Sequence, residues 1–335
     1  PTNGPGGLLN ITGLPVTAQT EFGGSTATDN SGSIKYLRIE YAGGLNPVNE
    51  VEWEMDMASG LSLSGVGSAT TIENVIVKFS RDDAFQFIGG TVNAKYLIAY
   101  NDGDDSFDFD RGYTGKLQFL ISYNAVPSTV AIRANGVESL NDKDASAASP
   151  YTRPVISNMT IIGPEGTDAD MTHQSQGIYI RKNTRFNIQN SIIAGYSNGG
   201  LMMCTKTKPL CVNNLGSEFK YNLVHSDYST RAFTFDYGGS GIIINPDPEV
   251  AGYAIQENPI EKPSLNKNKI INATADLQLK GLYAAVPDLS PASGSPALTN
   301  ANLTGADFST FFTSAAFIGA IGTDNWASGN WVHWQ

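Results

Sequence analysis

Long apolar runs are missing from this chain, and charged residues are scarce. No stretch stays apolar for the roughly 18 residues that a membrane-spanning helix requires, and the longest apolar runs are 241–244 and 317–321. Asp, Glu, Lys and Arg make up only 16% of the residues, and no segment has apolar residues at helical spacing for more than about three turns. These absences exclude a transmembrane helix and an α/β doubly wound fold.

Basic residues are also few. The chain has 21 Lys and Arg against 32 Asp and Glu, so its net charge is −11. Nucleic-acid binding requires clustered Lys and Arg, and here the basic residues are scattered, so no nucleic-acid partner is expected. The sequence starts at Pro1 with neither a Met nor a signal segment, which indicates a processed or truncated product.

Only two cysteines occur, Cys204 and Cys211. Their separation suits a disulfide that closes a small surface loop, and a disulfide would place the protein in an oxidising compartment. Two free buried thiols and a metal site are the alternatives. A metal site has the least support, because no second cysteine pair and no nearby histidine completes a ligand set.

What the sequence does contain is 35 glycines and a repeated apolar run. Side chains alternate between two faces along such a run, which predicts that Ile76, Leu97 and Leu120 lie on one face. An offset of slightly more than 20 residues is typical of one coil of a parallel β-helix. The aligned runs are 75–80, 96–101 and 119–124.

A second motif follows the first two runs. The pattern Asp-Asp-x-Phe-x-Phe begins at Asp82 and again at Asp104. Together the two motifs predict an all-β fold, a right-handed parallel β-helix over residues 1–286. Aromatic residues, including three tryptophans, are expected to cover the last coil and hide its strand edges. The expected loop insertions are 138–153, 163–175, 204–216 and 245–268, and the expected C-terminal cap is 287–335.

Several of these segments resemble β-helical surface or secreted proteins of Gram-negative bacteria, namely Gly60–Val77, Phe87–Ile98 and Asp104–Tyr113. The resemblance continues through 154–162, 180–183 and 317–326. It implies a lipoprotein or exported protein, located outside the cell or on the outer-membrane surface. It also implies an outer-membrane partner of the TonB-dependent receptor class, and it supplies no reaction.

The segment Asn101–Asp108 has a narrower resemblance, to the Asn-x-Asp-Asp-Gly-Phe-Asp motif with which some pectate lyases hold calcium. Ser106 stands where that motif has glycine. A lyase of this kind also needs a basic residue that removes the proton next to a uronate carboxylate. Lys116 and Arg133 are the candidates, by proximity in the sequence alone.

Five aspartates in this region form the strongest chemical signal. Clustered carboxylate oxygens are the ligands that hard cations such as Ca²⁺ prefer. Alternatively, these residues stack on Asp82 and Asp83 of the preceding coil and accept backbone N–H bonds at a corner, as Asp does in turns. Both interpretations stay open. The five residues are Asp102, Asp104, Asp105, Asp108 and Asp110.

Other features are weaker. The segment Val51–Met57 alternates apolar and acidic residues, as a solvated strand face or an acidic rim would. The three histidines lie far apart and suggest no catalytic triad. Several tyrosines could stack on sugar rings or pack under loops, and they are Tyr100, Tyr113, Tyr123, Tyr151, Tyr179 and Tyr196.

Three functions follow from these patterns. The first is a non-catalytic surface or secreted protein that binds a glycan, another nutrient or an outer-membrane partner. The second is a calcium-dependent polysaccharide lyase. The third is a structural or adhesive subunit, which a large exposed apolar wall would indicate. The fold alone cannot choose among them, because β-helices serve all three.

Overall fold

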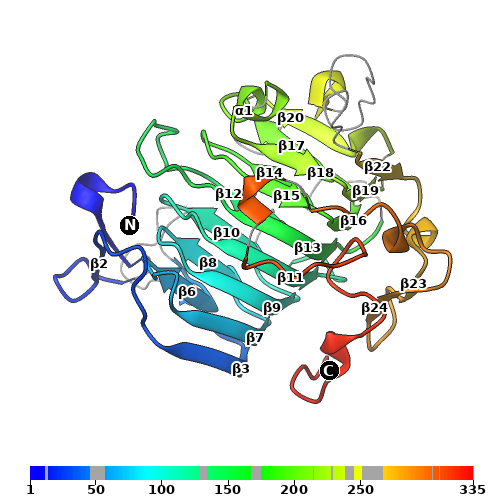
Figure 1. Ribbon diagram of the computed structural model, residues 1–335, viewed down its shortest axis with the longest axis horizontal. Coiled ribbons are helices and arrows are strands. Elements are labelled where there is room, and N and C mark those ends of the chain that lie inside the picture. The colour runs from blue at the N-terminus through cyan, green and yellow to red at the C-terminus, as the bar shows by residue number, and fades with distance from the viewer. Residues whose placement is uncertain are drawn as a thin grey trace.

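The chain winds around one axis, so that successive strands stack in parallel along it (Figure 1). This right-handed parallel β-helix is the fold that the repeats predict. The computed structural model describes residues 1–11, 14–45, 57–128, 134–166, 175–213, 215–227, 229–237, 245–250, 267–303, 305–308 and 310–334.

The larger sheet contains ten strands, and each of its pairs is parallel. Its main path runs through β3 (Ser33–Glu40), β7 (Thr71–Lys78), β9 (Asn93–Tyr100), β11 (Lys116–Tyr123), β13 (Val155–Ile162), β16 (Ile192–Tyr196), β19 (Leu223–Ser226) and β22 (Lys269–Ile271). Two short strands lie beside this path. The strand β15 (Asn187–Gln189) pairs with the first half of β13, and β18 (Glu218–Lys220) pairs with β15.

The second sheet contains eight strands and provides another side of the coils. Its order is β6 (Leu61–Ser64), β8 (Phe85–Ile88), β10 (Phe107–Asp110), β12 (Val137–Ser139), β14 (Ile178–Ile180), β17 (Leu201–Cys204), β20 (Phe233–Asp236) and the antiparallel β21 (Asn245–Pro246). Each coil therefore places one long strand in the larger sheet and one short strand in this sheet.

Small elements complete the described part of the chain. The short two-stranded sheets are β1 (Leu8–Asn10) with β2 (Glu21–Gly23), β4 (Gly44–Leu45) with β5 (Met57–Ala58), and β23 (Leu279–Gly281) with β24 (Asp288–Pro291). The helices are α1 (Lys208–Val212) and the 3₁₀ turns Pro5–Gly7, Ser229–Arg231, Thr274–Leu277, Pro296–Leu298, Ala306–Phe308 and Trp326–Ser328.

Each long strand bends at one residue with left-handed backbone, which divides it between two sides of the coil. Such a residue has a positive φ, a conformation that Asn tolerates better than most residues. The bend recurs once per coil, and in the later coils it separates β15 from β16 and β18 from β19. The bend residues are Tyr36, Asn74, Tyr96, Phe119, Asn158, Asn190 and Tyr221, with φ between 53 and 61°.

The register corrects one prediction. Leu97 and Leu120 align with Val75, not with Ile76. Ile76 aligns instead with Ile98 and points to the opposite side of the sheet. The prediction was wrong because the coil offset between β7 and β9 is 22 residues, and a slip of one residue reverses every side chain of a strand.

Aromatic rings stack along the inside of the eight-stranded sheet. Phe85 and Phe107 have ring centroids 5.3 Å apart, and Phe87 and Phe109 have centroids 5.1 Å apart. All four side chains are fully buried. The alternating pattern Phe-x-Phe therefore fills the core, and it forces the residue between each pair of phenylalanines to point outward.

The C-terminal residues 272–334 run back along the outside of the ten-stranded sheet, and we call this segment the C-terminal strap (Figure 1). Asn302 reaches Asn190, Asn158 donates to the carbonyl of Phe317 at 2.8 Å, and Lys78 donates to the carbonyl of His333 at 2.7 Å. The tryptophans expected over the last coil therefore lie against early coils.

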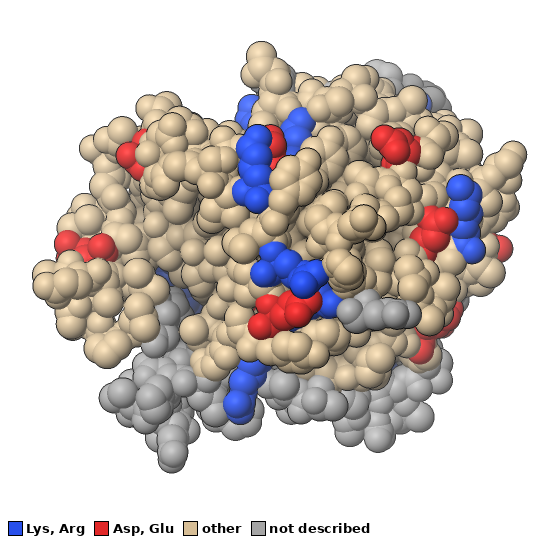
Figure 2. Space-filling view, turned by 90° about the horizontal axis from the view of Figure 1, so that it is seen from below, with Lys and Arg blue, Asp and Glu red and all other residues tan. Residues whose placement is uncertain are grey.

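Charged side chains are sparse on the face seen in Figure 2, and blue and red residues lie near one another there. This face therefore carries no extended field of one sign. In the part of the chain that the structure describes, no helix is long and apolar enough to cross a membrane.

Candidate cation-binding site

Two successive coils bring the predicted aspartates together. Asp82 and Asp83 precede β8, and Asp104 and Asp105 precede β10, 22 residues later. Because β8 and β10 pair in parallel with Phe85 beside Phe107, equivalent residues of the two coils stack on each other. The repeated Asp-Asp motif thus becomes a group of neighbouring carboxylates.

Part of this group forms a ladder with the backbone. Asp83 Oδ1 accepts a hydrogen bond from the N–H of Asp105 at 3.2 Å, and Asp105 Oδ1 accepts one from the N–H of Asn135 at 2.7 Å. Asn135 Oδ1 in turn accepts from the N–H of Gln176 at 2.9 Å. One oxygen of each aspartate is therefore committed to the turn, as the stacking interpretation expects.

Asp108 adds a carboxylate from the outer face of β10. It lies opposite Gln86, whose Nε2 donates to Asp108 Oδ2 at 3.4 Å. Asp108 is only 8% exposed, and its buried Oδ1 accepts no hydrogen bond from the described residues. A buried polar atom without a hydrogen-bond partner is costly, and a bound cation would remove this cost.

The closest approach involves Asp82, Asp83 and Asp104, each of which offers one oxygen within 4.8 Å of the other two. Ser59 Oγ lies 3.5 Å from both Asp82 and Asp83. Together with Asp105 and Asp108 these residues form what we call the acidic cluster. Among the described residues, no lysine or arginine forms an ion pair with Asp83, Asp105 or Asp108.

The electrostatics of the acidic cluster oppose its full ionisation. Burial, the largest cause, raises the pKa of Asp82 to about 6. Burial and then the neighbouring carboxylates raise the pKa values of Asp83, Asp105 and Asp108 well above the ordinary range. Carboxylates that repel one another need either protons or a bound cation. Oxygen ligands of this kind suit Ca²⁺, which takes six to eight of them.

The comparisons with known proteins agree with the fold. Residues 9–234 match the family described as the pectate-lyase like beta helix domain. The chain belongs to this family. No curated protein and no solved structure matches it.

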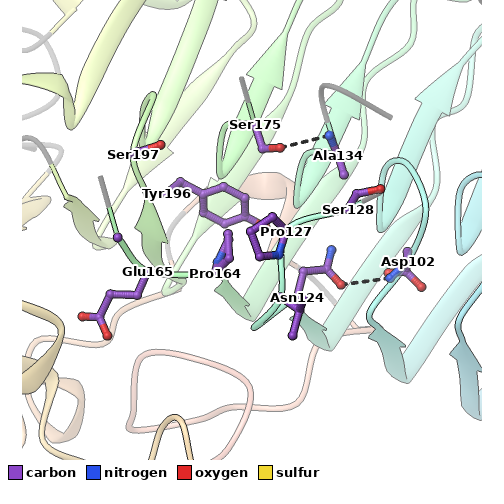
Figure 3. Close-up of a pocket in the computed structure, with 12 residues that line it drawn as sticks. Asp102, Asn124, Pro127, Ser128, Ala134, Pro164, Glu165, Ser175, Tyr196 and Ser197 are labelled. Atoms are coloured by element: carbon purple, nitrogen blue, oxygen red, sulfur yellow. Dashed lines mark hydrogen bonds between the residues drawn. The ribbon is translucent and has the colours of Figure 1, made fainter. Parts of the chain in front are cut away.

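Two other predicted ligands of this β-helix domain lie beside the acidic cluster. Asp102 turns toward Ser106 Oγ at 3.0 Å and Ser80 Oγ at 3.5 Å, and its N–H donates to Asn124 Oδ1 (Figure 3). Burial raises the pKa of Asp102 to about 8. Asp110, two residues beyond Asp108 on β10, has a buried Oδ1 without a partner, and burial raises its pKa to about 7.

Of the two predicted lyase bases, the structure describes Lys116 alone, and it places this residue away from the acidic cluster. Lys116 begins β11 in the ten-stranded sheet, where its N–H donates to Asn93 and its charge lowers the pKa of Asp307. Arg133, the acidic segment 51–56 and His173 lie outside the described residues.

Sequence reasoning missed Glu138 and Arg181, which continue the outer face past Asp108 together with Tyr179, one of the predicted tyrosines. Glu138 and Tyr179 occupy the positions beside Asp108 on β12 and β14. Arg181 NH1 donates to Glu138 at 3.1 Å, and its guanidinium lies 5.2 Å from the centroid of the Tyr179 ring. The signal was available, because Val137-Glu-Ser and Ile178-Tyr-Ile repeat the apolar–polar alternation of Phe107-Asp-Phe. The predicted insertion at 138 hid it, since β12 extends to Ser139.

The predicted disulfide is absent. Cys204 and Cys211 form no disulfide, and both are buried. Cys204 Sγ accepts from the N–H of Lys182 at 3.1 Å, whereas Cys211 belongs to the hydrophobic core from within α1. Suitable sequence spacing was therefore insufficient, because the two side chains have separate environments.

The tyrosines divide among different roles. Tyr113, Tyr179 and Tyr196 are buried, and Tyr100 and Tyr123 pack against Trp334 of the strap. Tyr151 lies under the guanidinium of Arg185, 3.3 Å from it. His225 is buried and accepts from the N–H of Gly195. None of these described side chains forms an open row on which a sugar could stack.

Proposed function

We infer that this protein binds a glycan without cleaving it, on a β-helix face that a divalent cation, best matched by Ca²⁺, organises. The observation that carries the inference is the buried, unpartnered Oδ1 of Asp108 beside the converging oxygens of Asp82, Asp83 and Asp104. A bound cation would be a partner for this oxygen and would neutralise the repulsion among the carboxylates.

The glycan part of the proposal is supported by the rest of the same face. Glu138, Tyr179 and Arg181 continue it along the axis, and Tyr179 donates to Asp236 at 2.6 Å. Membership in a pectate-lyase-like family favours a saccharide over other ligands, although a shared fold does not itself imply shared chemistry.

The absence of cleavage is proposed because Lys116, one of the two predicted bases, belongs to the other sheet, whereas Arg133 lies outside the described residues. A calcium-dependent lyase is the second candidate, and Arg181 favours it by lying on the same face as the carboxylates. Its guanidinium is held by Glu138 at 3.1 Å, so a catalytic role would require this ion pair to open.

Calorimetry with metal-stripped protein tests cation binding. We expect saturable Ca²⁺ binding near one site per chain, and loss of at least tenfold in affinity in Asp104→Asn and in Asp83→Asn. Asp144→Asn removes the same charge from an exposed turn and should bind Ca²⁺ as the wild type does. Undetectable Ca²⁺ binding in the wild type would refute the proposal.

A glycan array probed with and without Ca²⁺ tests the ligand, and absorbance at 235 nm on uronate polymers tests cleavage. We expect calcium-dependent binding and no new absorbance. Absorbance that Arg181→Lys abolishes would establish the lyase instead.

The predicted extracellular or outer-membrane location, the lipid anchor and the partnership with a TonB-dependent receptor stay predictions. The adhesive alternative has one observation against it. The apolar outer face of the ten-stranded sheet is covered by the C-terminal strap.

A further inference from the structure

A cavity lies among the turns that connect the two sheets, and Asp102, beside the acidic cluster, is one of its lining residues. Its volume is about 180 Å³. The turns after β9, β11 and β13 and the end of β16 line it, so it extends across several coils along the axis (Figure 3).

The described side chains that line this cavity include acidic groups and no basic group. Its described lining residues include the carboxyl groups of Asp102 and Glu165 and no lysine or arginine. Glu165 is held at the rim by a hydrogen bond from Thr274. An anionic ligand would be repelled by the Glu165 carboxylate, and none of the described lining residues offers a positive charge, so uronates, phosphates and sulfates are disfavoured.

The walls of the cavity are amphipathic. Tyr196, Pro127 and Pro164 line the cavity near one another (Figure 3), and these three side chains give it apolar surfaces. Ser175 and Ser197 add hydroxyl groups. Ser175 Oγ accepts from the N–H of Ala134 at 3.0 Å, so the hydroxyl hydrogen of Ser175 can still be donated.

An uncharged sugar ring has the complementary chemistry. Its C–H faces pack on aromatic and other apolar side chains, and its hydroxyl groups exchange hydrogen bonds with serines and carboxylates. A purely apolar ligand would leave the serine hydroxyls and the two carboxyl groups without partners, which costs free energy.

We propose that this cavity, bounded by Tyr196, Pro127 and Pro164, binds one neutral pyranose unit. The site is separate from the acidic cluster and needs no cation. Its occupant is either a free sugar or one residue of a longer neutral chain. The proposal does not rest on the function proposed above, and it extends the ligand range from the cation-organised face to uncharged saccharides.

Ligand-observed NMR in EDTA tests the proposal without involving the acidic cluster. The probes are the methyl glycosides of glucose, galactose and mannose, each compared with its uronic acid, and an oligosaccharide of each neutral sugar. At least one neutral glycoside is expected to bind with a Kd of about 1 mM, which corresponds to about −4 kcal/mol. Its uronic acid should bind at least tenfold more weakly. An oligosaccharide that binds no better than the glycoside identifies a free sugar as the occupant, and tighter binding identifies a chain.

Two substitutions locate the binding. Ser197→Tyr fills the cavity and should abolish sugar binding. Ser68→Tyr lies in another cavity of about 180 Å³, beside β7 and β9 of the ten-stranded sheet, and should leave sugar binding unchanged. Glu165→Gln keeps an acceptor for Thr274 but removes the charge, so the preference for neutral over uronic glycosides should fall several-fold.

Three results would overturn the proposal. They are no saturable binding of any neutral glycoside, binding that survives Ser197→Tyr, and a preference for glucosamine that exceeds tenfold over glucose, which would identify a cation site. A melting temperature within a few degrees of the wild type confirms that Ser197→Tyr is folded. If it is not folded, the Glu165→Gln discrimination decides. Because EDTA is present throughout, failure here leaves the calcium proposal unaffected.

Discussion

The two sheets of this β-helix are built from the same coils but differ on their outer faces. The ten-stranded sheet presents apolar side chains, and the strap covers them with Ile318, Ile321 and Trp334. The eight-stranded sheet presents the acidic cluster, where Asp108 retains a buried oxygen without a partner. The covered apolar side chains on the larger sheet include Ile76, Ile98, Ile121, Ile162, Ile192 and Leu223.

This difference separates what stabilises the fold from what binds. Inward side chains in both sheets follow the apolar repeat and determine the coil. On the larger sheet the outward side chains find their partners within the chain itself. On the smaller sheet Asp108 and Asp110 each keep one buried carboxylate oxygen that no described group contacts through a hydrogen bond, and local destabilisation of this kind is typical of functional sites.

The largest effect is expected where the strap closes. Trp334 is 6% exposed, packs against Tyr100 and Tyr123 and donates to the carbonyl of Ala327 at 3.1 Å. Trp334→Ala should lower the free energy of unfolding by about 3–5 kcal/mol, through lost burial and the cavity left behind. Urea denaturation measures the loss.

Trp331→Ala is the matched control for this substitution. Trp331 is only partly buried. Its ring stacks on Trp326 and meets Tyr36 edge-on, with ring centroids 6.1 Å apart in both pairs. Its loss should be less than half as large. Equal losses would mean that the strap is not closed by Trp334, and the contrast between a covered and an uncovered face would weaken.

The sequence predicts the inward half of this molecule better than the outward half. The repeats at Val75, Tyr96 and Phe119 reveal the coil because inward residues must match their neighbours above and below. The path of the strap leaves no such periodicity, since contacts such as Lys78 with His333 join residues 255 apart. The acidic cluster was visible because Asp82 and Asp104 repeat, whereas Glu138 was hidden by an irregular coil length.

The next prediction concerns the acidic cluster without its cation. Asp108→Asn removes one of several repelling charges, so at pH 7.5 in EDTA the variant should be more stable than the wild type by about 1–2 kcal/mol. Added Ca²⁺ at 100 times its Kd should stabilise the wild type by about 2.7 kcal/mol. The variant should gain clearly less.

Thermal denaturation in EDTA and in Ca²⁺ gives both numbers. Asp144→Asn should behave as the wild type in each buffer. A destabilised Asp108→Asn variant with an unchanged calcium response would show that Asp108 serves the fold and not a cation.

A smaller effect per unit of pH is expected from Asp102, whose folded pKa of about 8 lies above its ordinary value of 3.8. Between these values the folded chain holds a proton that the unfolded chain has released, so stability falls as pH rises, by up to about 1.4 kcal/mol per unit. Below 3.8 and above 8 the contribution is flat. Asp102→Asn should remove this slope, and urea denaturation at pH 5, 6 and 7 measures it. A slope equal to that of the wild type would contradict the protonation of Asp102.

The smallest effect is expected at the cysteines. Because Cys204 and Cys211 form no disulfide and lie in separate surroundings, a reductant should change the free energy of unfolding by less than about 0.5 kcal/mol. Loss of a disulfide would cost about 2–5 kcal/mol. Iodoacetamide should label both thiols in denaturant without any reductant, as mass spectrometry would detect. Labelling that appears only after reduction would support the predicted disulfide and, with it, the predicted oxidising compartment. It would also mean that the turn around α1 rearranges to bring the core thiol of Cys211 to Cys204.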